Sequence, residues 1–149
     1  MARKTHGELS AMERAAIEKI RRLRAAHIDG SIHDEQKERT EIMHDILRGY
    51  HGNVKLRLEV ISTALGCTIR TLEREFVAQY SETMSSFHEK TRLEYAEMQI
   101  TFNPSVKLMA VAAELGYDRE SEFNRFFRRK KGLSPTEFAR RVLSRQGEG

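Results

Sequence analysis

Cysteine, proline and tryptophan are scarce in this chain of 149 residues, which contains one, two and none of them respectively. The single cysteine, Cys67, excludes both a disulfide framework and a zinc site that needs several thiolates. Long hydrophobic runs are missing too, and the sequence does not open with a charged-then-apolar leader. We therefore expect a cytoplasmic protein.

Motifs for catalysis are equally absent. The sequence has no phosphate-binding loop ending in Gly-Lys-Ser or Gly-Lys-Thr, and no serine or cysteine stands in a nucleophile motif. Its six histidines lack the spacing of zinc ligands, so they are interpreted as surface or helix-capping residues. We expect no enzymatic activity, no metal and no cofactor.

The net charge of +4 is unevenly distributed along the chain. Positions 103–149 carry 10 basic and 6 acidic residues, whereas basic and acidic residues are balanced in the remainder. The excess includes a stretch free of Asp and Glu that contains Arg125, Arg128, Arg129, Lys130 and Lys131. A charge run of this kind is often no more than a solvated helix face, and only the residues around it can indicate another role.

The surrounding residues form the pattern of a helix, a tight turn and a second helix. The first helix is predicted to end at Leu115, and Gly116 supplies a turn in which a side chain would be strained. Asp118 is expected to cap the next helix by accepting hydrogen bonds from its free amides. That helix buries Phe123 and Phe127, four residues apart on one face, and its basic residues fall on the other sides. This pattern is typical of a helix-turn-helix, whose second helix packs through one stripe and enters a major groove.

The end of this unit is marked as well, because Gly132 stops the second helix and Ser134, Pro135 and Glu137 begin another.

A weaker copy of the pattern stands about 50 residues earlier. Its residues match the later ones at an offset of 50 up to the turn and 51 after it: Leu58, Val60, Ile61, Leu65 and Gly66, then Leu72, Arg74, Phe76 and Phe87. We interpret the chain as a tandem pair of related helical units, with one residue inserted in the second turn.

Residues 54–142 resemble the DNA-binding domain of the AraC/XylS family of transcription regulators. The most specific part is the run Ala-Ala-Glu-Leu-Gly-Tyr at 112–117, followed by Ser121, Phe123, Arg125, Phe127, Gly132, Ser134 and Pro135. The first unit departs from the pattern at Val77, where a basic residue is usual, and adds acid at Glu73 and Glu75. The resemblance implies two helix-turn-helix units on either side of a long linking helix. It also implies a bacterial-type regulator of transcription, more often an activator that contacts RNA polymerase than a repressor.

The expected fold class is therefore all-α, with helices near 9–27, 35–50, 58–65, 69–80, 85–102, 106–115, 119–131 and 135–144. Residues 1–53 are assigned to an N-terminal helical extension and 54–149 to the DNA-binding domain. Within the latter, 54–84 form the first helix-turn-helix, 85–102 the linker helix and 103–149 the second helix-turn-helix. At about 1.5 Å per residue the linker spans roughly 27 Å, of the order of the 34 Å or so of one DNA repeat. Two recognition helices at its ends are thus expected to enter successive major grooves.

Residues expected to contact base edges lie near the start of each recognition helix: Arg70, Thr71 and Arg74 in the first, and Arg119, Glu120, Ser121, Asn124 and Arg125 in the second. Arginine can bond both O6 and N7 of guanine, and asparagine both N6 and N7 of adenine. The residues expected to contact phosphate come later in the second helix: Arg128, Arg129, Lys130 and Lys131. Because the two helices differ, we expect an asymmetric target. The alternative for Arg74 and Arg125 is a structural ion pair with a neighbouring acid.

Residues 1–53 match no part of the resemblance. About 50 residues are too few for the β-rich ligand-binding domain that many relatives carry, so we expect no small-molecule sensor. A narrow apolar stripe there either docks on the DNA-binding core or pairs with a second chain to form a homodimer: Met12, Ala16, Ile17, Ile20 and Leu23. For the whole chain, the alternative function is a helical protein-binding adaptor whose basic face meets an acidic partner.

Overall fold

The computed structural model describes residues 8–26 and 35–147, so that His6, His27 and His33 lie outside the described part of the chain. The regular elements in these ranges are all helices: α1 (Ala11–Ala26), α2 (Glu35–Gly49), α3 (Leu58–Ala64), α4 (Ile69–Tyr80), α5 (Met84–Phe102), α6 (Leu108–Glu114), α7 (Glu120–Lys131) and α8 (Pro135–Gly147). The predicted all-α fold class is confirmed. Among the described helices, none is long and apolar enough to cross a membrane.

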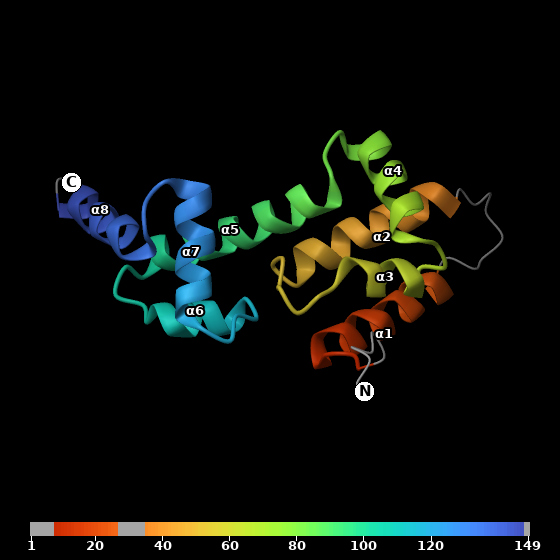
Figure 1. Cartoon of the computed structure of the whole chain (residues 1–149), viewed down its shortest axis with the longest axis horizontal. Coiled ribbons are helices and arrows are strands. Elements are labelled where there is room, and N and C mark those ends of the chain that lie inside the picture. Colours follow the sequence, from red (N-terminus) through yellow and green to blue (C-terminus); the bar gives the residue numbers. More distant parts are fainter. Residues whose placement is uncertain (1–7, 27–34, 148–149) are drawn as a thin grey trace, which may run out of the picture.

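Helix α5 joins two groups of helices, α1–α4 at one end and α6–α8 at the other (Figure 1). Its own side chains explain this division. Met84 and Phe87 belong to the core of the first group, while Ala96 and Ile100 belong to the core of the second. The buried residues of α5 lie along one face, which is apolar at both ends and carries the polar His88 and Arg92 in its middle. We call the two groups, each with its half of α5, the first and the second subdomain.

The core of the first subdomain includes residues from all of its helices. The apolar stripe predicted for the first helix faces this core: Ala16 and Ile20 are buried, and Met12 and Leu23 pack against them. Helix α2 adds four further buried side chains: Ile42, Met43, Ile46 and Leu47. Helices α1 and α2 lie in the segment predicted to be an N-terminal extension, and they share one core with α3 and α4.

The core of the second subdomain is built around Phe123 and Phe127, which are fully buried. Their ring centroids lie 5.9 Å apart, and the ring of Phe138 meets that of Phe127 edge-on at 5.5 Å. Burying one such side chain stabilises a fold by roughly 1.5–3 kcal/mol. The phenylalanines thus hold α7 through one face and leave its remaining sides available.

The two helix-turn-helix units have the same dimensions. Helices α3 and α6 each contain 7 residues and begin 50 positions apart, whereas α4 and α7 each contain 12 residues and begin 51 positions apart. Gly66 and Gly116, which follow α3 and α6, both have left-handed backbones, with φ of 82° and 90°. The predicted repeat, including the one-residue insertion in the second turn, is confirmed.

The inserted residue changes how the second recognition helix begins. Thr68 is the N-cap of α4, and its hydroxyl oxygen accepts a hydrogen bond from the amide of Thr71 at 3.1 Å. The N-cap of α7 is Arg119, whose side chain makes no capping hydrogen bond. The prediction that Asp118 caps α7 is wrong, because the extra residue places its carboxylate before the cap position. Asp118 instead accepts a hydrogen bond from Nζ of Lys55 at 2.8 Å.

The predicted boundary between α7 and α8 is confirmed. Gly132 is the left-handed C-cap of α7, with φ of 81°. Ser134 and Glu137 then form a capping box, in which the Glu137 amide donates to Oγ of Ser134 at 3.1 Å and the Ser134 amide donates to Oε1 of Glu137 at 2.9 Å. Pro135 is the first residue of α8.

Candidate nucleic-acid interface

Helix α4 presents two arginines to solvent. Arg70 and Arg74 are exposed, and neither side chain has a hydrogen bond or ion pair within the described part of the chain. The opposite face of α4 is held by Leu72 and Phe76, which are fully buried. Thr71, the third predicted base contact in this helix, is half-buried, and its hydroxyl accepts a hydrogen bond from the capping hydroxyl of Thr68.

The acidic residues of α4 serve the fold. Oε2 of Glu75 lies 2.8 Å from a guanidinium nitrogen of Arg39 on α2, and both side chains are largely buried. Glu73 accepts a hydrogen bond at 2.8 Å from the amide of Met84, the first residue of α5. Glu75 is thus paired with Arg39, and Glu73, whose partner is an uncharged amide, makes no ion pair with Arg70 or Arg74 in the described chain.

Helix α7 exposes a comparable set of side chains near its start. Arg119, Ser121 and Arg125 are exposed, whereas Glu120 and Asn124 are half-buried. Oδ1 of Asn124 is enclosed and has no hydrogen-bond partner among the described residues. An asparagine that pairs with adenine uses both Oδ1 and Nδ2. The predicted contact by Asn124 therefore requires its side chain to turn outward.

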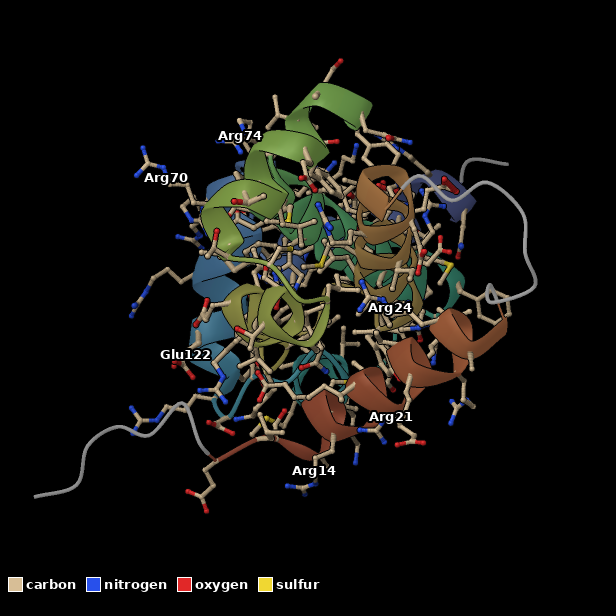
Figure 2. All side chains as sticks on the ribbon, turned by 90° about the vertical axis from the view of Figure 1, so that its right-hand side faces the viewer. Arg14, Arg21, Arg24, Arg70, Arg74 and Glu122 are labelled. Atoms are coloured by element: carbon tan, nitrogen blue, oxygen red, sulfur yellow. The ribbon has the colours of Figure 1, made fainter. Side chains whose placement is uncertain are left out.

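The two recognition helices lie on the same side of the molecule. Arg70 and Arg74 project toward the side on which α7 lies, and Glu122 of α7 projects there too (Figure 2). Helix α1, with Arg14, lies away from that side. Neither Arg74 nor Arg125 forms the alternative ion pair within residues 8–26 and 35–147. Both arginines thus have their charges available to a ligand.

The later part of the basic stretch is tied to other helices. Three of its ion pairs lead to α5 and one leads to α8: Lys130 to Glu89 at 2.5 Å, Arg129 to Glu89 at 3.2 Å, Lys131 to Glu97 at 3.0 Å, and Arg128 to Glu137 at 3.8 Å. Burial alone would raise the pKa of Glu89, but hydrogen bonds from Lys130 and Arg129 outweigh it and lower that pKa below its ordinary value. Glu89 is therefore charged at neutral pH and offsets part of the positive charge.

A buried polar layer separates the two apolar cores. It contains His88 and Arg92 from the middle of α5, with exposed fractions of 8% and 7%. Nε of Arg92 donates to the carbonyl oxygen of Gly52 at 2.7 Å, and Nε2 of His88 lies 3.0 Å from that of Asn53. Burial, helped by the charge of Arg92, lowers the pKa of His88 to about 4. The ring is neutral at neutral pH, and its Nε2 carries the proton that it donates to Asn53.

The expectation that histidines lie at the surface or at helix caps is wrong for His88. The loop that follows α2 covers this residue, although 35 positions separate His88 from Asn53. Sequence reasoning also missed Arg92, whose position four residues after His88 puts both on one face of α5. That spacing continues through Ala96 and Ile100, which are buried, and it is the signal that could have revealed the buried layer.

A family model described as a helix-turn-helix domain matches residues 61–141, more than half of the chain. The chain belongs to this AraC-type helix-turn-helix family. The family resemblance predicted from sequence is thus confirmed. No curated protein matches the sequence.

Among solved structures, this AraC-type chain is similar to a DNA-binding transcriptional dual regulator from Escherichia coli K-12, with a TM-score of 0.57. The two are 19% identical, and the match covers 78% of this chain and 99% of that one. At this identity the likeness shows a common fold. Because residues 54–149 form a smaller share of the chain than the match covers, the common fold includes residues before position 54.

Proposed function

We propose that this protein is a sequence-specific DNA-binding transcription regulator whose α4 and α7 enter successive major grooves of one asymmetric promoter site. One observation carries the proposal: α4 and α7 lie on the same side of the molecule and bear exposed arginines that no carboxylate of the described residues neutralises (Figure 2). The E. coli regulator of the same fold is described as DNA-binding, which supports this assignment.

The length of the linker helix supports the engagement of two grooves. Helix α5 contains 19 residues, which corresponds to roughly 28 Å at about 1.5 Å per residue. Adjacent major grooves on one face of DNA recur at about 34 Å. Recognition helices mounted near the two ends of α5 are thus separated by a distance of the right order. Since the two helices carry different exposed side chains, their two half-sites differ.

The roles of individual residues follow from exposure and position. Base contacts are assigned to the early part of each recognition helix: Arg70, Thr71 and Arg74 on α4, and Arg119, Glu120, Ser121, Asn124 and Arg125 at α7. Among these, Arg70, Arg74, Arg119 and Arg125 combine exposure with a free guanidinium within the described structure. An arginine pair with guanine is worth about 1–3 kcal/mol of discrimination, so these four carry most of the expected specificity.

Phosphate contacts are assigned to the later part of α7. Arg128 is the principal candidate, because its side chain is 67% exposed and its distance of 3.8 Å to Glu137 makes a weak pair. Arg129, Lys130 and Lys131 reach phosphate by exchanging their carboxylate partners on α5. The Arg129 side chain is 57% exposed, whereas those of Lys130 and Lys131 are 32% and 31% exposed, so the exchange costs least for Arg129.

The proposal includes activation of transcription through a contact with RNA polymerase, as the family resemblance implies, and a cytoplasmic location, where bacterial DNA lies. A reporter gene that carries the bound site upstream of a promoter measures the direction of regulation. Higher expression with the protein than without it supports activation. Lower expression assigns the protein as a repressor and leaves DNA binding intact.

The ion pairs of α7 weigh against a protein-binding adaptor with a basic face. Such an adaptor needs a continuous unpaired patch of positive charge, and Glu89 and Glu97 interrupt the basic stretch here. Free exposed arginines occur on both recognition helices and also on α1, α2 and α8 of the described chain, so they do not form one broad basic face. The arginines of α4 and α7 suit two localised contacts in DNA grooves.

Selection of bound duplexes from a random pool tests the proposal. We expect an asymmetric consensus with two half-sites about 10–10.5 base pairs apart. Binding to that consensus should weaken as salt rises, with a logarithmic slope of about −0.9 for each phosphate contacted. Failure to enrich any sequence, or an affinity for acidic polypeptides that equals the affinity for duplexes, would reject the proposed function.

A further inference from the structure

We propose that the loop at residues 51–55, here called the clamp loop, locks the two subdomains together and thereby fixes the spacing of half-sites that the protein accepts. The clamp loop follows α2, which is part of the first subdomain, and it reaches both the middle of α5 and the turn between α6 and α7 (Figure 1). This inference rests on the proposed function. It adds a positioning role for residues that contact no DNA.

On one side, the clamp loop is bound to α5. Arg92 donates to the carbonyl oxygen of Gly52, as described above, and His88 donates to that of Asn53. The ring of His51 stacks on that of Tyr95, with centroids 4.0 Å apart and planes 24° from parallel. These contacts extend along the middle of α5 and involve three consecutive residues of the loop.

On its other side, the clamp loop is bound to the second helix-turn-helix. The amide of Val54 donates to the carbonyl oxygen of Leu115 at 2.9 Å. Nδ2 of Asn53 donates to the carbonyl oxygen of Glu114 at 3.1 Å. The Lys55–Asp118 pair continues the same contact at the surface. The clamp loop therefore reaches the end of α6 and the turn that leads directly into recognition helix α7.

Arg92, which lies on α5, contacts both the clamp loop and the second helix-turn-helix. Besides Gly52, its guanidinium donates to the hydroxyl of Tyr117 at 3.3 Å and lies 4.9 Å from the ring centroid of Phe126 on α7. It has no carboxylate partner in the described chain, so these groups and Nδ1 of His88, 3.4 Å from the guanidinium, compensate its burial. A buried charge held in this way has one well-defined position, because leaving any of these partners unpaired is costly.

Two glycines allow the close approach. Gly52 has φ of 65°, and a Cβ there would lie 2.3 Å from the carbonyl oxygen of His88. Gly116 has φ of 90°, and a Cβ there would lie 2.2 Å from Oδ1 of Asn53. The contact at Gly52 is with backbone, and at both positions any other residue would also be strained by the left-handed backbone. Glycine thus permits the close approach of the clamp loop both to α5, at Gly52, and to the turn between α6 and α7, at Gly116.

A fixed orientation has a direct consequence for DNA binding. One added base pair between half-sites turns the second groove by roughly 35° about the DNA axis, given about 10–10.5 base pairs per turn. A rigid protein cannot follow that rotation unless the DNA is deformed, which costs free energy. A loosened protein can follow it, but it loses the advantage of being preorganised for the correct spacing.

The first test measures the orientation in the absence of DNA. Spin labels are attached to cysteines that replace two exposed residues, Ala78 on α4 and Glu122 on α7, in a Cys67→Ala background. Electron–electron double resonance then gives the distribution of distances between the recognition helices. We expect one narrow distribution for the parent protein and a broader one for Arg92→Met and for Asn53→Ala. The Asn53 change is included because it leaves the buried arginine in place and is the milder one.

The matched control is Arg24→Met. Arg24 also donates to a backbone carbonyl, that of Leu65 at 2.8 Å, but both residues belong to the first subdomain. Its loss should lower stability without broadening the distance distribution. A distribution that stays narrow in Arg92→Met and Asn53→Ala would overturn the clamp, whatever the protein binds. Equal broadening in the control would overturn it as well.

The second test uses the selected duplex with one or two base pairs added or removed between its half-sites. For the parent protein we expect each one-pair change to weaken binding about tenfold or more. For Arg92→Met and Asn53→Ala we expect weaker binding at the best spacing and a penalty below about threefold for each change. The same spacing penalty in all proteins would contradict the inference. If no duplex is bound specifically, the proposed function fails, while the distance measurement still decides whether the clamp exists.

Discussion

Glu89 of α5 and Lys130 of α7 lie 2.5 Å apart, Oε1 to Nζ, and this contact fastens the proposed recognition helix to the linker helix. The same carboxylate also pairs with Arg129. The sequence predicts that Arg129 and Lys130 contact DNA phosphate, but in the free protein both side chains pair with Glu89. A substitution of Glu89 should therefore release both side chains to bind phosphate.

Replacing Glu89 with Gln should increase affinity for DNA of any sequence, because Arg129 and Lys130 lose their competing carboxylate. The logarithmic salt slope should steepen by up to about 1.8, for two added phosphate contacts at about 0.9 each. Glu94→Gln is the control, since Glu94 is exposed on α5 and has no ion pair in the described structure. Titration of a non-cognate duplex at several salt concentrations measures both effects, and identical slopes for the two variants would refute the exchange.

Arg125→Ala and Arg128→Ala should differ in kind. Loss of Arg125 should relax preference at one or two base pairs of one half-site, at a cost of about 1–3 kcal/mol on the cognate duplex. Loss of Arg128 should weaken binding to all duplexes alike and reduce the salt slope by about 1. Competition binding with single-base variants of the site separates these outcomes. An equal loss on every sequence from Arg125→Ala would demote it to a backbone contact.

Glu13→Gln should destabilise the first subdomain strongly. The Glu13 side chain is fully buried and accepts hydrogen bonds from the Arg57 guanidinium at 2.8 and 2.9 Å. Because the Arg57 side chain is 32% exposed, water can solvate its charge after the substitution, so the expected cost is about 1.5–3 kcal/mol, the usual value for a hydrogen bond to a charged group. Glu18→Gln, which removes an exposed pair with Arg21, should cost less than about 1 kcal/mol. Urea unfolding of the two variants provides the comparison, and similar midpoints would contradict the importance given to Glu13.

Acidification should destabilise the fold in two separate steps. His88 has a folded pKa of about 4 against an ordinary 6.5, so between these values the unfolded chain binds a proton that the folded chain does not. The free energy of unfolding is unaffected by this proton above pH 6.5, and it falls by up to about 3 kcal/mol as the pH drops to 4. Arg92 adds to this effect by repelling the protonated ring, whereas Glu89 opposes it.

Glu13 acts at lower pH. Burial would raise its pKa, but hydrogen bonds from Arg57 and Ser10 outweigh this and lower it to about 2, against an ordinary 4.5. Its contribution is present above pH 4.5 and is lost as the pH falls toward 2. Unfolding free energies measured across this range should lose the upper step in His88→Gln and keep the lower one. An unchanged upper step in that variant would assign it to another group.

Much of this fold follows from local sequence signals. Apolar spacing, the turn glycines and the Ser134–Glu137 box predict the helices of the described chain to within a few residues at each end. The duplicated pattern predicts both recognition helices and places Arg74 and Arg125 at equivalent positions. These features can be predicted from the sequence because each depends only on residues within about one or two turns of helix.

The features that the sequence does not reveal depend on distant residues. Asp118 has a suitable side chain for a helix cap, yet Lys55 is its partner, 63 positions away. His88 and Arg92 are polar, and only the approach of the clamp loop makes their burial favourable. The basic stretch likewise has carboxylate partners on another helix. Propensity and periodicity carry no information on such pairings, which arise only once the two subdomains are in contact.

We propose that two unlike recognition helices on one side of this chain engage a single DNA site. Hydroxyl-radical footprinting of the selected duplex tests it directly, with the parent protein, Arg74→Ala and Arg125→Ala. We predict two protected segments on one face of the duplex about one helical turn apart, with each variant losing protection mainly in a different segment. A single protected segment, a symmetric footprint from one protomer, or loss of the same segment in both variants would contradict the claim.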